Sequence, residues 1–414
     1  MKSLPVVATL LVTVTVSVSA QVPVDRALLA EIRAIRAVDN HCHIPPASAP
    51  LPAALSSTEP LGKTEFPYPA RLRSENPEWR RAWHALYGLE VTDSTAKSTN
   101  EILRRKRERM RERGESWPGW VLDKSGIDVA LVNMPRLPSN GGDRFLLVPH
   151  ANGLIFPFAE PRRAALPATL NEYIGSVVRP QLQQWKKDGA VAVKFSTAYS
   201  RSLDFAAVES ETAARIYQQH AAAKTIPSAA DDKALQDYLF RVVAREAGAV
   251  GLVVHVHTGI GADPYFAIAG ADPLLLEGAL NDPTLRSTKF VLIHGGWPFD
   301  RQAGTMLIKP NVYADFSAHT FLRYPRSLAE TLRGWLEWYP EKVLFGTDAY
   351  PEAGAPINTW EEMMWFANDS AREALAIALS GMIADGEITR GRAIELARMV
   401  LRENALKLYG IGAR

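Results

Sequence analysis

Short apolar runs alternate with longer amphipathic segments along most of the chain. The apolar runs are only a few residues long, rich in Val, Leu and Ile, and nearly continuous rather than alternating with polar residues. Runs of this kind are typical of parallel strands that are buried on both faces. We expect about eight of them, at Ile35–Asn40, Ile127–Val132, Phe145–Val148, Ala190–Phe195, Gly251–Val256, Phe290–Ile293, Val312–Phe316 and Val343–Phe345.

The segments between these runs have the spacing of amphipathic helices, as in Tyr173–Lys187, Lys233–Glu246 and Ser327–Tyr339. Repeated strand–helix units indicate a parallel sheet, and its simplest form is a closed barrel. An open doubly wound sheet is the alternative, but no glycine-rich nucleotide loop follows the first run. The sequence therefore predicts an α/β protein with a (β/α)8 TIM-like barrel.

Two segments do not belong to a bare barrel. Residues 45–122 interrupt the first strand–helix unit with a Pro/Ala/Ser-rich stretch, Pro45–Pro60, followed by helical patterns. An insertion that leaves the C-terminal end of a strand lies above the barrel mouth, where it can cap a site. A helical tail, residues 360–414, follows the last run. We expect residues 21–414 to form a single barrel domain with these two additions.

Residues 1–20 have the pattern of a secretory signal peptide. Lys2 supplies a positive charge, Leu4–Val16 an apolar stretch, and Val18–Ala20 a small-residue cleavage pattern. A membrane anchor is the alternative, but the stretch is short and rich in Thr and Ser, and no later stretch is long and apolar enough to span a bilayer. We expect a mature chain that begins at Gln21 and is periplasmic or secreted, without stable membrane insertion.

Charge and cysteine content narrow the classes of function. Lys and Arg number 47 and Asp and Glu 45, a net charge of +2, which argues against a nucleic-acid binder. The most highly charged run, Arg104–Arg113, also contains acidic residues and is typical of a solvated helix face. The single cysteine, Cys42, excludes an internal disulfide and a thiolate-built metal site. We expect a small-molecule substrate, and the sequence leaves open whether the chain forms a homo-oligomer.

Histidines and an aspartate follow several apolar runs, which points to metal binding. His41 and His43 are two residues apart at the end of the first run, so both project from the same face of the strand. Two imidazoles at a barrel mouth can chelate a divalent metal. Because the carboxyl ends of barrel strands meet at the mouth, residues that end other runs converge there. Those residues are His257, His294 and Asp348.

Two neighbours of these residues are not expected to bind metal. Cys42 lies between the two histidines and points the opposite way, as a small buried hydrophobe. His255 precedes His257 by two residues and so faces the interior one layer deeper. We expect His255 to be a core histidine or to support a ligand rather than to ligate.

The motifs HCHI, HTG, IHGG, FGTD and ENALKLYG together resemble the amidohydrolase superfamily, in its amidohydrolase-related (type 2) branch. The likeness runs from about Asp39 to Gly410 and is weakest in the insertion. VKFSTAYSRSL and HTGIGAD are similar to a narrower group, which includes the amidohydrolase-like domain fused to a glutamine-synthetase-like domain. The resemblance implies a distorted barrel with one or two divalent ions at the mouth. The usual ion is zinc, with manganese or another divalent ion left open.

The resemblance also assigns roles to residues. It places His41, His43, His257, His294 and Asp348 at metal-ligand positions. Lys194 lies where members with two metals carry a lysine whose carbamate bridges the ions, and an unmodified base or substrate ligand is the alternative. An unpaired buried ammonium is unfavourable, which argues against a lysine without a role on this apolar run. Asp348, His294 and Lys194 are the expected catalytic residues.

Four side chains just past strand ends are candidates for substrate contact, each with ordinary packing as its alternative. Arg201 suits an anionic substrate group, and His319 follows the seventh run closely enough to reach substrate from the mouth. An aromatic side chain beyond a ligand position can form a wall of the pocket. The four candidates are Tyr199, Arg201, Trp297 and His319.

These features predict metal-assisted hydrolysis of a C–N or C–O bond in a small-molecule amide, ester or lactone. Asp348 is expected to accept a proton from a water molecule activated by the metal, and to deliver it to the leaving group. One alternative is non-oxidative decarboxylation of an aromatic or conjugated carboxylate, against which the Lys194 pattern weighs. The other is a non-catalytic binding protein on the same barrel, against which the complete ligand set weighs.

Overall fold

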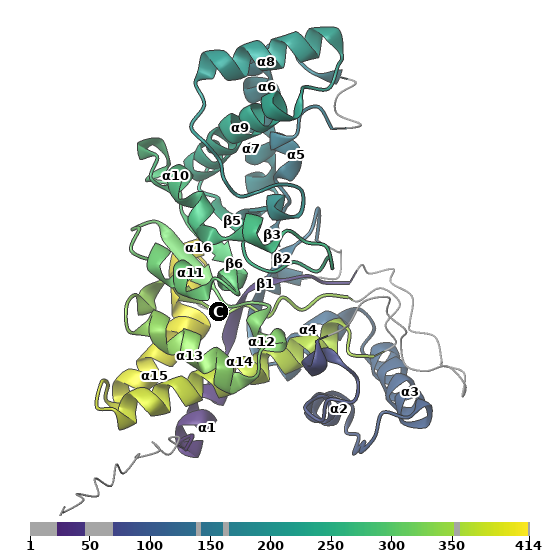
Figure 1. The fold of residues 1–414 in the computed structure, drawn as a ribbon. Coiled ribbons are helices and arrows are strands. Elements are labelled where there is room, and N and C mark those ends of the chain that lie inside the picture. Colours follow the sequence, from purple (N-terminus) through teal and green to yellow (C-terminus); the bar gives the residue numbers. More distant parts are fainter. Residues whose placement is uncertain (1–22, 46–68, 138–141, 160–164, 352–356, 413–414) are drawn as a thin grey trace, which may run out of the picture.

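A computed structural model describes residues 23–45, 69–137, 142–159, 165–351 and 357–412. Parallel strands alternate with helices along this part of the chain (Figure 1). Every apolar run expected to be a strand is one, so this prediction is confirmed. The strands are β1 (Ala37–Cys42), β2 (Ile127–Asn133), β3 (Phe145–Val148), β4 (Ala192–Phe195), β5 (Val253–His257), β6 (Phe290–Ile293), β7 (Val312–Asp315) and β8 (Val343–Leu344).

The strands form two parallel sheets, in the orders β1-β2-β3 and β4-β5-β6-β7-β8. Backbone hydrogen bonds connect the two sheets at both places where their edge strands meet. Between β3 and β4, the Lys194 N–H donates to the Pro149 carbonyl at 2.8 Å. Between β8 and β1, the Asn40 N–H donates to the Phe345 carbonyl at 2.8 Å. The strands therefore close into a ring, which is the barrel that the sequence predicts.

Helices surround this ring and extend it at one end (Figure 1). The expected helix at Tyr173–Lys187 is built from α6, a π-helical turn at Ile174–Val178 and α7. The helices are α1 (Arg26–Ala34), α2 (Trp79–Tyr87), α3 (Ala96–Arg113), α4 (Trp117–Lys124), α5 (Asn152–Ile155), α6 (Leu170–Tyr173), α7 (Arg179–Lys187), α8 (Ser210–Ala223), α9 (Ala229–Ala249), α10 (Glu277–Leu280), α11 (Asp300–Met306), α12 (His319–Leu322), α13 (Pro325–Leu336), α14 (Trp360–Ala384), α15 (Arg390–Arg398) and α16 (Asn404–Tyr409).

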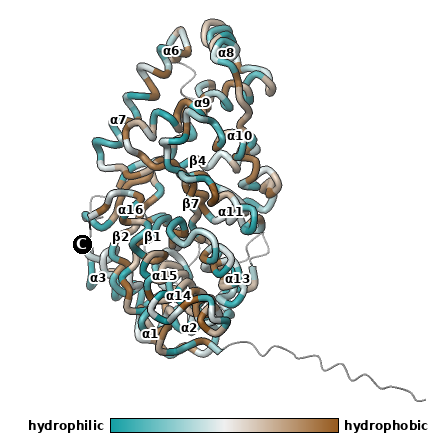
Figure 2. The backbone as a smooth tube through the Cα atoms, turned by 90° about the vertical axis from the view of Figure 1, so that its left-hand side faces the viewer, coloured by the Kyte–Doolittle hydropathy of each residue, from teal (hydrophilic) through white to brown (hydrophobic). Residues whose placement is uncertain are grey.

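Successive residues of each strand pack into different cores. On β6, Val291 and Ile293 belong to a cluster inside the ring, whereas Phe290 and Leu292 pack between the strands and the helices. Both faces of the strands are therefore apolar, as the continuous runs indicate. Figure 2 shows the hydrophobic positions gathered around β4 and β7 at the centre of the molecule. Helix α16 packs against the inner cluster through Ala405 and so covers the floor of the barrel.

The described part of the insertion packs along α14. Trp79 of α2 stacks on Phe366, with ring centroids 4.3 Å apart. Lys106 of α3 forms ion pairs with Glu361 at 2.7 Å and Glu362 at 3.2 Å, and all three side chains are buried. Most of the Pro-rich stretch lies outside the described residues. The expected position of the insertion over the barrel mouth stays a prediction.

Most of the strongly charged run Arg104–Arg113 on helix α3 lies on a solvated face, as expected, but Lys106 of the same run is buried against α14. Arg104 is half-exposed and donates to Glu101 at 2.8 Å and to Glu108 at 2.5 Å, three and four residues away. Arg109 forms a similar ion pair with Glu112 at 2.8 Å. Local pairs of this kind are what the charge pattern predicts for a solvated helix face.

The sequence predicts a signal peptide at the N-terminus and helices at the C-terminus. The tail after β8 is helical as expected, in α14, α15 and α16. The expected signal peptide, residues 1–20, lies outside the described residues. Among the helices that the structure describes, none combines the length and apolar character needed to cross a membrane.

Candidate metal centre

A β-bulge in β1 determines which side chains of this strand face the interior of the barrel. Asp39 pairs with Ala130 and Cys42 pairs with Val132, so β1 advances by three residues while β2 advances by two. A bulge breaks the alternation of side chains and re-aims the residues beside it. His41 consequently points into the barrel, while Cys42 turns outward and is buried between strands and helices, as expected.

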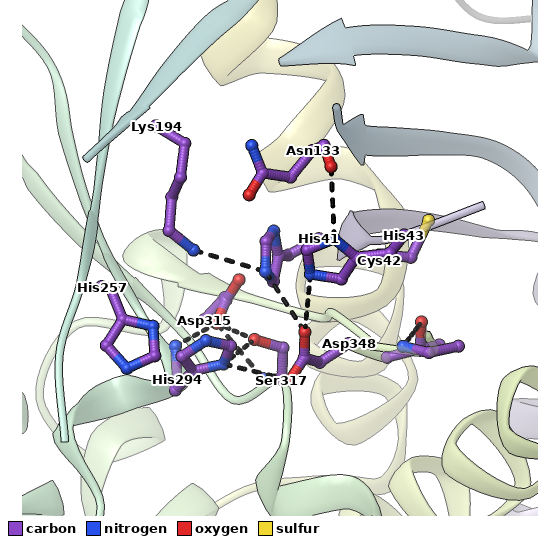
Figure 3. A network of polar contacts seen from close by, with 12 residues as sticks. His41, Cys42, His43, Asn133, Lys194, His257, His294, Asp315, Ser317 and Asp348 are labelled. Atoms are coloured by element: carbon purple, nitrogen blue, oxygen red, sulfur yellow. Dashed lines mark hydrogen bonds and ion pairs between the residues drawn. The ribbon is translucent and has the colours of Figure 1, made fainter. Parts of the chain in front are cut away.

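His41, His43 and Asp348 form a compact group at the barrel mouth (Figure 3). The Nε2 atoms of His41 and His43 lie 3.3 and 3.4 Å from the same oxygen of Asp348. Ligand atoms of these three residues all lie within 4.8 Å of one another. The His41 side chain is 1% exposed and that of His43 is 34% exposed, so the group has a buried side and an open side. Two imidazole nitrogens and a carboxylate oxygen are a suitable donor set for zinc and related divalent ions.

The backbone of β2 selects the form of His43 that suits a metal ligand. Its Nδ1 lies 3.2 Å from the carbonyl oxygen of Asn133, which can only accept a hydrogen bond. Nδ1 therefore carries the hydrogen, and the lone pair lies on Nε2, the atom that faces Asp348. Metal-binding histidines are commonly held in this way. The residues present thus fit a divalent ion.

His294 and His257 lie beside this group at greater separations. His294 Nδ1 is 3.8 Å from Asp348, and its ring centroid is 5.2 Å from that of His41. The His257 ring lies 4.6 Å from His294, and its Nε2 is 3.2 Å from the Ile260 carbonyl oxygen. The structure therefore brings the five expected ligand residues together, with His41, His43 and Asp348 closest.

His294 and Asp348 share an unusual backbone conformation. Their φ angles are 66° and 55°, in the left-handed region that residues other than glycine rarely adopt. Such a conformation is unfavourable by about 1–3 kcal/mol and persists where the surroundings enforce it. Here the His294 N–H donates to Asp315 at 2.9 Å, and the Asp348 N–H donates to the His41 carbonyl at 2.7 Å. Strained residues of this kind cluster at functional sites.

Lys194 reaches the same group from β4. Its Nζ lies 3.3 Å from His41 Nε2, and its side chain is buried. Burial lowers the pKa of Lys194 to about 8, although Asp348 and Asp315 oppose this change. Near that pH the amine is partly neutral, which is the form that accepts a proton or reacts with CO2. Both expected roles of Lys194, as a carbamate and as a free amine, stay predictions.

The protonation states suit metal binding. Burial lowers the pKa of His41 and His294 well below the ordinary value, and lowers that of His257 to about 3. Burial raises the pKa of Asp348, but its interactions with His294, His43 and Lys194 outweigh burial, so the pKa of Asp348 is lowered overall. Near neutral pH the imidazoles of His41, His257 and His294 are therefore neutral and the Asp348 carboxylate is ionised, and these are the forms that bind metal ions.

Sequence reasoning missed Asp315, a buried residue at the end of β7. Its carboxylate accepts hydrogen bonds from the His294 N–H at 2.9 Å, Ser317 Oγ at 2.7 Å and Asn40 Nδ2 at 2.6 Å. Burial raises its pKa to about 6 despite these donors. An acidic residue at the end of an apolar run was the available signal, in the motif NVYADFS.

Two expected substrate contacts lie beside histidine rings, Tyr199 beside His257 of the cluster and Trp297 beside His319. The Tyr199 ring is 4.8 Å from that of His257, and its side chain is 47% exposed. The Trp297 ring lies 6.5 Å from that of His319. Tyr199 thus lies beside the histidine cluster and is partly exposed, so a substrate can contact it.

The other two expected contacts are held by protein groups. His319 is buried, and its Nε2 lies 2.8 Å from the His294 carbonyl oxygen, so it supports the loop that carries His294. The Arg201 guanidinium donates to Asp237 at 2.5 Å and to Gln236 at 3.0 Å, both on α9. The structure therefore does not direct Arg201 to the histidine cluster.

Comparison with known proteins identifies the family of the chain. Residues 159–411, more than half of the chain, match the amidohydrolase family model (Amidohydro_2). The chain therefore belongs to the amidohydrolase family. Protein fluG of Emericella nidulans is 28% identical over 233 residues, which cover 53% of this chain and 25% of that protein. The chain thus matches about a quarter of the length of this relative.

Solved structures of similar shape share the barrel. A protein from Lactobacillus casei ATCC 334, assigned as a metal-dependent hydrolase, has a TM-score of 0.62 and 17% identity, covering 92% of this chain and 97% of that one. Uronate isomerase from Thermotoga maritima has a TM-score of 0.66 and 13% identity, covering 92% and 96%. At these identities the likeness concerns the fold, which is that of a TIM-barrel amidohydrolase.

Proposed function

We propose that this chain is an exported hydrolase that cleaves a C–N or C–O bond of a small-molecule amide, ester or lactone. The observation that carries the proposal is the placement of one Asp348 oxygen 3.3 and 3.4 Å from the Nε2 atoms of His41 and His43. A carboxylate so close to two imidazoles can share a cation with them and also exchange a proton with substrate. Membership of the amidohydrolase family supports this reading.

The proposed cofactor is a divalent ion, with zinc as the first choice, held by His41, His43 and Asp348. When bound, such an ion polarises a substrate oxygen and lowers the pKa of a water molecule towards about 7. His257 and His294 adjoin this group, and one compact set of three ligands supports one essential ion.

Asp348 is the residue proposed to move the proton. Its carboxylate is ionised near neutral pH and its side chain is 15% exposed, so it is accessible from the mouth. It accepts a proton from the attacking water and returns it to the leaving group. Lys194 provides a second buried nitrogen 3.3 Å from His41, which can hold a charged substrate oxygen or, as a carbamate, bind metal.

A substrate panel tests the proposed reaction. The metal-reconstituted protein is incubated with amides, esters and lactones, and with aromatic and conjugated carboxylates. The proposal expects release of an acid with its amine or alcohol, dependent on added metal and lost in Asp348→Asn. Release of CO2 without hydrolysis products would instead indicate a decarboxylase, and metal binding without turnover a binding protein.

Export is a separate part of the proposal, and it is supported by the sequence of residues 1–20 alone. Expression of the full chain in a bacterial host, followed by N-terminal sequencing of the extracytoplasmic material, tests it. We expect the sequence to begin at Gln21. Exported material that still begins at Met1 contradicts the proposal.

A further inference from the structure

A chain of buried hydrogen bonds connects the last helix to the centre of the barrel. The Tyr409 hydroxyl, on α16, donates to Asn40 Oδ1 and lies 2.7 Å from His255 Nε2. Asn40 Nδ2 then donates to Asp315 Oδ2 at 2.6 Å. Asn40, His255 and Asp315 are completely buried. The chain of bonds therefore passes through the floor of the barrel, where water does not compete with it.

The same chain continues to the candidate metal centre. Asp315 Oδ1 accepts from the His294 N–H at 2.9 Å and from Ser317 Oγ at 2.7 Å. Ser317 Oγ lies 2.9 Å from Nδ1 of the same histidine (Figure 3). Both the backbone and the ring of His294 are thus connected to Tyr409 through Asn40 and Asp315.

The chemistry of the groups fixes the direction of the bonds around Asn40. An ionised carboxylate only accepts, so Asn40 must present its NH2 group to Asp315 and its oxygen to Tyr409. Tyr409 then donates its one hydrogen to Asn40 and accepts from the Nε2–H of His255. The other ring nitrogen of His255 is buried without a partner among the described residues, which suits a nitrogen that carries no hydrogen.

The same reasoning fixes the ring of His294. Ser317 donates its hydrogen to Asp315, so its oxygen is left to accept from His294 Nδ1. His294 therefore carries its hydrogen on Nδ1 and its lone pair on Nε2. A histidine in this form can accept a proton or bind a metal only through Nε2.

We propose that Tyr409 is a positioning residue of the metal centre, which orients Asn40 and Asp315 so that His294 is held with its lone pair on Nε2. This inference rests on the proposed metal centre and extends it to a residue from the C-terminal helix. Without the Tyr409 hydroxyl, the Asn40 oxygen lacks a donor and the amide loses its fixed orientation. A rotated amide places an oxygen against the Asp315 carboxylate, which weakens the support of His294.

Tyr409→Phe tests the inference, because it removes one hydroxyl and keeps the ring. Tyr313→Phe is the matched control, since Tyr313 packs against the same inner cluster and its hydroxyl takes no part in the chain of bonds. The first measurement is the zinc dissociation constant in chelator-buffered metal. We expect an increase of about tenfold in Tyr409→Phe and little change in Tyr313→Phe, because His294 adjoins the ligand Asp348, with its Nδ1 3.8 Å from that carboxylate.

The second measurement is the ¹⁵N spectrum of histidine-labelled, metal-free protein, with the His294 signals assigned by their loss in His294→Gln. We expect Tyr409→Phe to move these signals from the Nδ1–H form towards a mixture of tautomers, and Ser317→Ala to move them further. Neither measurement needs a substrate, so a failure to find hydrolysis leaves this test intact.

Wild-type zinc affinity and wild-type His294 signals in folded Tyr409→Phe would overturn the inference. If Tyr409→Phe does not fold, Asn40→Ala breaks the same link from the other side. The inference expects the same loss of zinc affinity in that variant, and wild-type affinity in folded Asn40→Ala also overturns it.

Discussion

Lys194 Nζ lies 3.3 Å from His41 Nε2, the nitrogen that also faces Asp348. A lysine so close to a metal-binding nitrogen serves as a carbamate bridge between two ions or as a free amine beside one ion. The compact group of His41, His43 and Asp348 favours one ion. The metal content of Lys194→Ala distinguishes these two roles.

Lys194→Ala is expected to leave the metal content at about one ion per chain and to lower turnover by about 100-fold or more, as for loss of an acid–base group. Elemental analysis of folded protein gives the metal content, and circular dichroism confirms folding. The account of Lys194 fails if the wild-type protein holds two ions and the variant holds one, because that result indicates a bridging carbamate.

The two inward-facing histidines His41 and His255 are expected to behave differently. His41→Ala removes a ligand nitrogen and should empty the site. His255 instead contacts Tyr409 at 2.7 Å, so His255→Ala should keep its metal when zinc is in excess and lose about 2 kcal/mol of stability. Metal analysis and urea unfolding of both variants check this, and equal metal loss would contradict it.

The stability of the metal-free protein should fall in acid. Burial lowers the folded-state pKa of His257 to about 3, from 6.5. Between these values the unfolded chain binds a proton that the folded chain does not, so this contribution to stability is complete above pH 6.5 and is lost as the pH falls towards 3. Between pH 7.5 and 5.5 it amounts to about 1 kcal/mol.

His257→Gln removes this titrating group and tests its share. The free energy of unfolding, measured in urea at pH 7.5 and 5.5, should change less in the variant than in the wild type. Other buried groups are common to both proteins and cancel in the comparison. The same pH dependence in both would refute the assignment.

The sequence and the structure give Arg201 different roles, and a substitution can distinguish them. The sequence offers it as a contact for an anionic substrate group, whereas the structure pairs it with the buried Asp237 on α9. Arg201→Met should destabilise the protein by about 2 kcal/mol, because the buried Asp237 loses its hydrogen bond from Arg201 and keeps only the ion pair with Lys233 at 2.6 Å. KM for any substrate found should stay near the wild-type value, and a large rise in KM with unchanged stability supports the substrate role.

The sequence predicted the barrel and the convergence of its polar residues well, for a physical reason. Strands buried on both faces need continuous apolar runs, and these runs mark where each strand ends. A polar residue at that point, such as His257 on β5 or Asp348 after β8, must then lie at the mouth of the barrel. No knowledge of distant contacts is needed for this step.

Other features depend on contacts between distant segments, which a single sequence does not record. The bulge in β1 arises from its register against β2, so the alternation rule alone cannot show that His41 and Asn40 both contact interior residues. The partner of Arg201 lies 36 residues further along the chain. Asp315 was overlooked although it ends a strand, because its contacts with His294 and Asn40 join segments that lie far apart in the sequence.

The central claim is that a divalent ion binds between His41, His43 and Asp348. An anomalous difference map, recorded at the zinc absorption edge from crystals grown with zinc, tests this most directly. The account predicts one strong peak about 2.0–2.2 Å from Nε2 of both histidines and from a carboxylate oxygen of Asp348. A fully folded barrel with no peak at these atoms, or with its only strong peak elsewhere, would contradict the account.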